Sequence, residues 1–330
     1  MPIAFIIGLG AGLASAALFA SAWTGTALGV LVLFFLSPLP VAIAGLGWGW
    51  ACGALAATVG MAIVAVAGGG RSGLVYLIAL GAPAAVFSYF AMLNRSVPAD
   101  GSSRDGGEGS VVVEWYPVGR IVAWASLWAG LTAAVSMLSV ATDVAMLRAV
   151  LLEVFEKSSL FDGLGQSGKK LTNEEKNAFV AVMTVFFPWA IATMWFAVAT
   201  LNLWLAANIT HRSGRLARPW PDLSALQLPP AMPLAFGIAI LGTFASGMPG
   251  LVASGFASAL MFAFMLAGLA ILHRVSRGHS MRPMLLGLVY SSLMFLSPFS
   301  TLLIAMLGLA EPYLRRRIPP GAQPPPNMPT

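Results

Sequence analysis

Apolar runs about as long as a membrane-crossing helix dominate the chain. A helix needs about 20 apolar residues to cross a bilayer, and no Asp, Glu, Lys or Arg occurs before Arg71. Runs near that length cover residues 3–21, 25–38, 41–67, 74–93, 120–140, 178–208, 232–246, 250–272 and 284–310. The pattern predicts an all-α fold, a polytopic transmembrane helical bundle. It has nine spans, or eight if Trp23 to Thr26 is a break inside one discontinuous helix.

The arginines between these runs predict the orientation of the helices. Cytoplasmic loops of membrane proteins carry an excess of Lys and Arg. The loops after the fourth, sixth and eighth runs fall on one face and hold Arg95, Arg104, Arg120, Arg212, Arg215, Arg218, Arg274, Arg277 and Arg282. We expect this face to be cytoplasmic in a bacterial inner membrane. Nine spans then place arginines 315–317 outside, a conflict that disappears if 284–310 is a hairpin of two short helices or if the tail is an exception to this statistical rule.

The polar segments divide the chain into parts. Residues 1–93 are predicted to be N-terminal transmembrane helices, and the first is expected to stay uncleaved because no Lys or Arg precedes it. Residues 94–119, rich in Gly and Ser, are predicted to be a flexible loop. Residues 120–311 hold the C-terminal transmembrane helices, and 312–330 form a basic and then proline-rich tail.

The charged connection 141–177 is expected on the face opposite the arginine loops. Within it, residues 143–157 are predicted to form a short amphipathic helix, because apolar residues recur there at helical spacing. A polar turn is expected over 162–170. Thr172 and the acids after it are typical of the start of the next helix.

Composition supports the membrane assignment. Hydrophobic residues make up 58% of the 330 residues and charged residues only 9%, compared with about 25% charged residues in soluble domains. The net charge of +6 indicates topology and contact with membrane lipids, not nucleic acid, because no basic segment is interleaved with exposed aromatic residues. The arginines predicted to contact anionic lipid are Arg212, Arg215, Arg218, Arg274 and Arg277.

The sequence lacks the motifs of common catalytic and metal sites. Cys52 lies in an apolar run, and His211, His273 and His279 lie in or beside basic loops, so neither a metal site nor a cofactor is expected. No Gly-x-Ser-x-Gly, His-Glu-x-x-His or complete Gly-x-x-x-x-Gly-Lys-Ser/Thr motif is found. Polar side chains inside the spans, such as Asn202, are interpreted as helix-to-helix hydrogen bonds. We therefore expect a protein that is not an enzyme.

Small residues recur every four positions in two of the predicted spans. The set in the first span comprises Ala4, Gly8, Gly12, Ala16 and Ala20. The set in the third comprises Gly45, Gly49, Gly53 and Ala57. Small residues let helix backbones approach closely in lipid, where no hydrophobic effect holds helices together. These faces are interpreted as packing surfaces within the bundle, or alternatively as docking faces for a helix of another protein.

Three segments give the chain a resemblance to a known family. They are Leu36-Ser37-Pro38-Leu39-Pro40 followed by the Gly-rich helix through Gly53, Asn202-Leu203 to Arg218-Pro219-Trp220-Pro221-Asp222, and Gly308-Leu309-Ala310-Glu311. On these residues the sequence resembles, over nearly its full length, the bacterial membrane proteins called domain of unknown function 2232, or YybS-like. Those proteins are similar in turn to the substrate-binding S components of energy-coupling-factor vitamin transporters. The resemblance implies a ligand cavity and a first helix whose small-residue face meets a membrane coupling subunit. The chain departs from the six-helix S-component pattern in its extra C-terminal spans.

Two functions agree with these observations. The first is a solute-binding membrane component similar to a transporter S component, with a small-molecule ligand and another membrane subunit as partners. The alternative is a membrane scaffold or assembly factor that binds other membrane proteins through its arginine loops and small-residue faces. A lipid-modifying enzyme has no acid, base or nucleophile constellation to support it.

Overall fold

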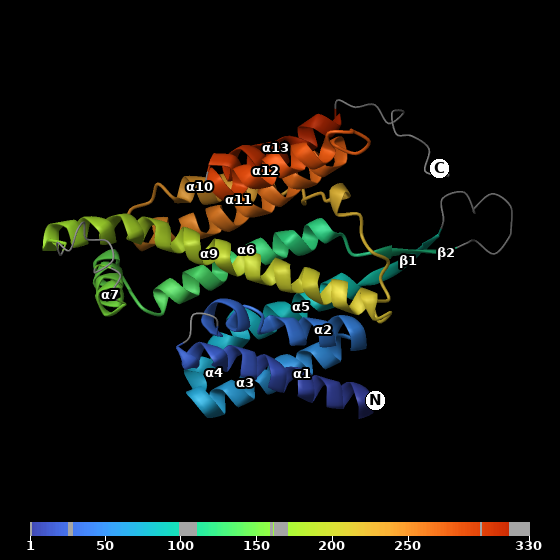
Figure 1. The fold of residues 1–330 in the computed structure, drawn as a ribbon, viewed down its shortest axis with the longest axis horizontal. Helices are drawn as coiled ribbons and strands as arrows, with labels where there is room; N and C mark the ends of the chain where they lie inside the picture. Colours follow the sequence, from blue (N-terminus) through green and yellow to red (C-terminus); the bar gives the residue numbers. More distant parts are fainter. Residues whose placement is uncertain are drawn as a thin grey trace.

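The computed structural model describes residues 2–25, 29–98, 111–158, 161, 171–297 and 299–316. Figure 1 shows its helices in three groups, α1 to α5, then α6 with α9, then α10 to α13. In chain order the α-helices are α1 (Pro2–Ala20), α2 (Pro38–Trp48), α3 (Trp50–Gly68), α4 (Gly70–Tyr76), α5 (Ala82–Met92), α6 (Val118–Leu138), α7 (Val144–Lys157), α9 (Asn173–Arg212), α10 (Met232–Gly242), α11 (Met248–Val275), α12 (Arg282–Phe295) and α13 (Phe299–Arg316). Shorter 3₁₀ and π segments are η1 (Ser21–Thr24), η2 (Gly29–Phe34), η3 (Leu77–Gly81) and η5 (Leu223–Ala225).

Six helical segments in the described part of the chain are long and apolar enough to cross a membrane. They are Ile3–Trp23, Trp50–Gly68, Gly70–Met92, Val118–Leu138, Asn173–Arg212 and Met248–Val275. Three shorter apolar helices accompany them, Val32–Trp48, Met232–Gly242 and Phe299–Pro312. The predicted helical membrane bundle is thus confirmed. The structure has six long spans where eight or nine were expected, because several apolar runs are divided into shorter helices.

The apolar run 41–67 contains two helices that meet at a glycine. Gly49 has a φ of 97°, which only glycine adopts without strain, and it separates α2 from α3. The two helices fold back on each other, so that a Cβ added at Gly53 would lie 2.9 Å from the Cα of Gly45. The continuous small-residue face predicted for Gly45, Gly49, Gly53 and Ala57 on one helix is therefore wrong, because Gly45 lies on α2 and only Gly53 and Ala57 lie on α3. Gly45 and Gly53 instead face each other across the turn.

The small-residue face of α1 packs against α3. A Cβ added at Gly12 would lie 2.7 Å from the carbonyl oxygen of Ala56, and one at Gly8 would lie 2.8 Å from Cδ2 of Leu55. Gly8, Gly12 and Ala16 are buried, and Ala4 and Ala20 near the helix ends are half-buried. This face is filled from within the chain. The large apolar side chains that α1 exposes are Ile3, Phe5, Ile6, Leu9 and Leu13.

Both ends of the predicted flexible loop 94–119 contain a β-strand. Strand β1 (Asn94–Pro98) pairs antiparallel with β2 (Val111–Trp115), with Asn94 opposite Trp115. Valines favour a strand, and three of them begin β2, while Arg95 and Glu114 form a cross-strand ion pair of 2.7 Å. The Gly- and Ser-rich composition that suggested a loop comes from residues 99–110, which lie outside the described residues.

Helices α11 and α13 run in the same direction and end together. Gly268 lies against the carbonyl of Ile304, and further along both helices the guanidinium of Arg274 is 3.7 Å from the buried carboxylate of Glu311. The run 284–310 is therefore a hairpin of α12 and α13, which is the alternative that removes the conflict over the arginines after 311. Residues 315 and 316, the last of α13, return to the end of the bundle that carries Arg274.

The arginine-bearing connections gather at that same end. Arg277, just after α11, forms an ion pair of 2.7 Å with Asp222, and Arg218 donates to the carbonyl of Ala91 near the end of α5. Figure 1 shows the start of α1, the β1–β2 hairpin and the end of α13 on this side of the molecule. We call this the arginine end.

Helix α7 and the first turns of α9 lie at the opposite end (Figure 1). The predicted amphipathic segment 143–157 is helical from Val144, and the carboxylate of Asp143 accepts a hydrogen bond from the amide of Met146. Thr172 and Glu175 form a capping box at the start of α9, as the sequence indicates. With 40 residues, α9 is about 60 Å long, twice a hydrocarbon core of about 30 Å. The polar turn expected over 162–170 lies outside the described residues.

The contact between α1 and α3 predicts opposite outcomes for two substitutions on one helix. Gly12→Leu should destabilise the fold by about 1–3 kcal/mol through overpacking. Gly10→Leu should leave stability unchanged, because a Cβ at Gly10 meets nothing within 4 Å. Thermal unfolding in mild detergent, followed by size-exclusion chromatography, measures both. Equal unfolding temperatures for the two variants would contradict this packing.

The shared position of the arginine connections predicts a labelling pattern. In a Cys52→Ala background, cysteines placed at Ser213 and Ser280, both exposed at the arginine end, should react with an impermeant maleimide only in inside-out vesicles. Cysteines at Thr142 and Ser158, exposed at the other end, should react only in right-side-out vesicles. If the cysteines at positions 213 and 280 reacted from opposite sides of the membrane, the arginine-bearing connections would not share one end of the molecule.

Candidate functional site

A cleft of about 1020 Å³ opens at the arginine end between α6, α9 and α11. Its volume is at the upper end of the range for small-molecule sites. Its apolar walls come mainly from Val118, Ile121, Val122 and Ala125 of α6, Ala197, Leu201, Leu203, Trp204 and Ala207 of α9, and Leu266, Leu269 and Ala270 of α11. Along α11 the lining extends from Leu266 to Arg277, a rise of about 16 Å. The cleft therefore reaches from the surface toward the middle of the bundle.

Small side chains line part of the cleft. Ala125, Ala197 and Ala270 each present only a methyl group to it; Ala125 and Ala270 are buried beside the packed core, whereas Ala197 is exposed on α9. On the α9 side the lining residues Leu201 and Trp204 are 52% and 44% exposed. The cleft is thus open along this flank as well as at the arginine end.

Most of the polar lining residues gather where the cleft opens. This group, which we call the cleft mouth, consists of Arg218, Asp222, Ser224, His273, Arg277, Arg282 and Tyr290. They come from the connection after α9, the end of α11 and helix α12. The cleft therefore combines an apolar body with a polar, mainly cationic opening.

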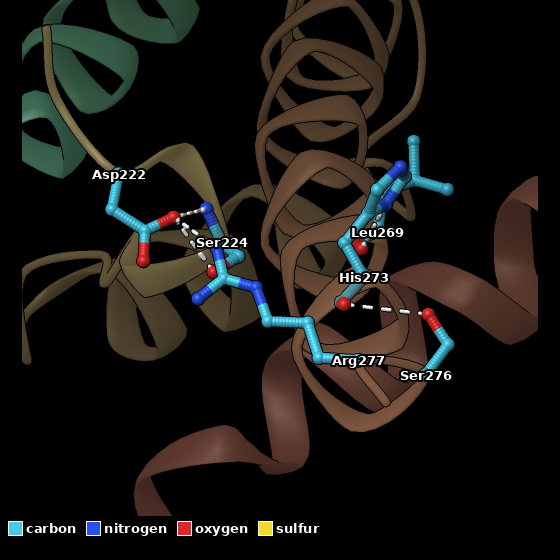
Figure 2. Close-up of polar contacts among 6 residues, drawn as sticks. All are labelled: Asp222, Ser224, Leu269, His273, Ser276 and Arg277. Atoms are coloured by element: carbon cyan, nitrogen blue, oxygen red, sulfur yellow. Dashed lines mark hydrogen bonds and ion pairs between the residues drawn. The ribbon is translucent and has the colours of Figure 1, made fainter. Parts of the chain in front are cut away.

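Asp222 connects two elements across the mouth (Figure 2). Its Oδ1 accepts hydrogen bonds from the amide of Ser224 at 3.0 Å and from the hydroxyl of Ser224 at 2.8 Å. The same oxygen accepts from the Arg277 guanidinium at 2.7 Å. These contacts, with Arg277 the largest, lower the pKa of the Asp222 carboxyl below its usual value. The carboxylate is thus held ionised and fixes the η5 turn to the end of α11.

His273 lies in the last turn of α11, four residues before Arg277, which follows the helix. Its Nδ1 is 2.9 Å from the carbonyl oxygen of Leu269 (Figure 2), so Nδ1 carries the hydrogen in this contact. The other ring nitrogen, Nε2, is 3.4 Å from the hydroxyl of Tyr290 on α12. The imidazole therefore directs one nitrogen into the helix and the other toward the hairpin.

Two arginines of the mouth have no acidic partner among the described residues. Arg218 is half-buried, donates to the carbonyl of Ala91 at 3.0 Å and lies 5.9 Å from the ring centroid of Trp115. Burial lowers its pKa, but an arginine stays protonated at neutral pH. Arg282, the first residue of α12, is also half-buried. Both cations line the cleft without a carboxylate to neutralise them.

The arginines that the sequence predicted to contact lipid have different surroundings. Only Arg218 and Arg277 line the cleft. Arg274 points to Glu311, Arg215 lies 5.2 Å from the ring centroid of Trp48, and Arg212 is exposed at the end of α9. The structure brings Arg218 and Arg277 together with Asp222, His273, Arg282 and Tyr290, which the sequence did not assign to a site.

The polar interior position Asn202 has a packing role. Its Nδ2 donates to the carbonyl of Phe35 at 2.8 Å and to that of Val198 at 2.8 Å. It thus ties α9 to the segment just after η2, as expected for a helix-to-helix hydrogen bond. Over the described ranges, no three His, Cys, Asp or Glu residues gather in an arrangement that could hold a metal ion.

Comparison with known proteins places the chain in a family. No curated protein and no solved structure shows significant similarity to it. The family described as predicted membrane protein (DUF2232) matches residues 13–311, which include α3, α6, α9, α11 and every residue of the cleft mouth. The match covers most of the chain and agrees with the resemblance carried by the segments around Pro38, Trp220 and Glu311. The protein therefore belongs to the DUF2232 family of predicted membrane proteins.

Proposed function

We propose that this protein is a non-enzymatic, solute-binding membrane protein that holds an amphiphilic small molecule in the cleft. The observation that carries the proposal is the joining of apolar walls and a polar mouth in one cavity of about 1020 Å³. Apolar walls with a few convergent polar groups are typical of ligand sites. A purely structural gap between helices would have no need for half-buried, unneutralised arginines at its opening.

The polar groups of the mouth favour binding over catalysis. A general base of the His–carboxylate type needs a carboxylate that orients the imidazole. Here the contacts of His273 are Leu269 and Tyr290, while those of Asp222 are Ser224 and Arg277. The two titratable groups are thus engaged with different partners.

The scaffold alternative has less support. It relies on the arginine loops and the small-residue faces, and on the face of α1 Gly8 and Gly12 lie against α3. The same contact weakens the implied S-component arrangement, in which this face would meet a coupling subunit. We retain a second membrane subunit as a proposed partner and the inner membrane as the proposed location, while the ligand site itself rests on the cleft.

Filling the cleft should abolish binding. Ala197→Trp adds an indole to a lining position on α9, and Ala190→Trp adds the same group two turns earlier at an exposed position outside the cleft. After addition of a bacterial polar lipid extract to delipidated protein, native mass spectrometry should detect one retained molecule per chain for wild type and Ala190→Trp. Ala197→Trp should retain at least tenfold less. Equal retention by both variants would refute the cleft as the binding site.

A further inference from the structure

We propose that the ligand of the cleft is a lipid whose headgroup ends in a phosphate monoester, bound with its phosphate at Arg218 and Arg282 and its hydrocarbon chain along α6, α9 and α11. This inference rests on the proposed function and adds the chemical class of the ligand. Its evidence is the charge of the mouth, the position of the mouth relative to the apolar walls, and the pairing of Asp222.

The charge of the mouth favours a dianion. Three guanidinium groups, Arg218, Arg277 and Arg282, and one carboxylate, Asp222, line the opening, which leaves a net charge of about +2. A phosphate monoester carries about −1.5 to −2 charges at pH 7 and would neutralise it, whereas a phosphodiester carries one charge. Guanidinium groups also bind phosphate oxygens through paired, planar hydrogen bonds.

The apolar walls favour a lipid over a soluble phosphate compound. A soluble anion would occupy the mouth and leave the half-buried walls around Leu203, Leu266 and Leu269 in contact with water. A lipid buries its chain against them while its phosphate stays at the arginine end, the level where a headgroup lies. The exposed flank at Leu201 and Trp204 would let the hydrocarbon chain of a lipid enter the cleft sideways from the bilayer.

Asp222 reduces the positive charge that the mouth offers to a ligand, because its carboxylate pairs with Arg277. Its carboxylate holds Arg277 at 2.7 Å, so a bound phosphate reaches Arg218 and Arg282 more readily than Arg277 and is repelled by the carboxylate. Asp222→Asn keeps an oxygen that can accept from the amide of Ser224 while it removes the negative charge. This variant frees Arg277 for the ligand and should bind phosphate more tightly.

The test measures competition between lipids for purified, delipidated full-length protein by native mass spectrometry. The probes are dioleoyl phosphatidic acid, phosphatidylglycerol and phosphatidylcholine, which present a monoester, an anionic diester and a zwitterion. Phosphatidic acid should be retained most and phosphatidylcholine least. Arg282→Gln should weaken phosphatidic acid binding about fivefold, Arg282→Lys should restore most of it, and Asp222→Asn should strengthen it about fivefold, as expected for one cation gained or lost.

Arg212→Gln is the matched control, because Arg212 is an exposed arginine at the same end but outside the cleft. It should leave all three lipids unchanged. An equal effect of Arg212→Gln and Arg282→Gln, or equal retention of the three lipids, would overturn the inference while the proposed lipid site survives. If Ala197→Trp retained as much lipid as the wild type, the lipid would not occupy the cleft, and this result would instead overturn the proposed function. A thermal shift with inorganic phosphate as large as with phosphatidic acid would identify a soluble phosphate ligand and also contradict the inference.

Discussion

Close approach of helix backbones through glycine is the constraint on which the rest of this structure depends. Apolar side chains gain little by leaving lipid for a protein interior, so helices associate through tight packing and hydrogen bonds. At Gly12 the α3 backbone is so near that a Cβ would lie 2.7 Å from a carbonyl oxygen, and at Gly53 it would lie 2.9 Å from the Cα of Gly45. Gly268 and Gly308 bring α11 and α13 together in the same way. These contacts fix where the remaining helices can lie.

The sequence predicts the helical bundle well because its strongest signal is local. The runs 3–21 and 120–140 correspond closely to α1 and α6, since uniform apolar composition alone decides that they are helices in lipid. Thr172 and Asp143 act as helix caps, as their residue types suggest. Gly49 shows where this local signal ends. In the sequence it is one glycine of a four-residue repeat, and only the fold reveals that its φ of 97° turns the chain back.

The candidate site is harder to predict because its residues are distant in sequence. Asp222 and Arg277 are 55 positions apart, and the hydrogen bond from Arg218 reaches Ala91 across 127 positions. The positive-inside rule placed Arg218 and Arg277 on one face, but it treats all arginines alike. Burial distinguishes Arg218 and Arg282 from exposed Arg212. The absence of an acidic partner within the described residues distinguishes them from Arg277, and neither property can be derived from spacing.

Small side chains have opposite consequences in the two parts of the bundle. Between α1 and α3 they are met by a neighbouring backbone, and the interface closes. Between α6, α9 and α11 close packing extends only part of the way. Gly130 lies against Phe256, and Gly255 lies against Ala133 and Pro188, so the three helices meet nearer the end that carries α7. Toward the arginine end they line a space of about 1020 Å³, to which Ala125, Ala197 and Ala270 contribute only methyl groups and of which the connection from Trp220 to Leu226 forms one wall. The cavity is therefore a consequence of where the close contacts stop, and the arginines at its opening give that cavity a chemistry.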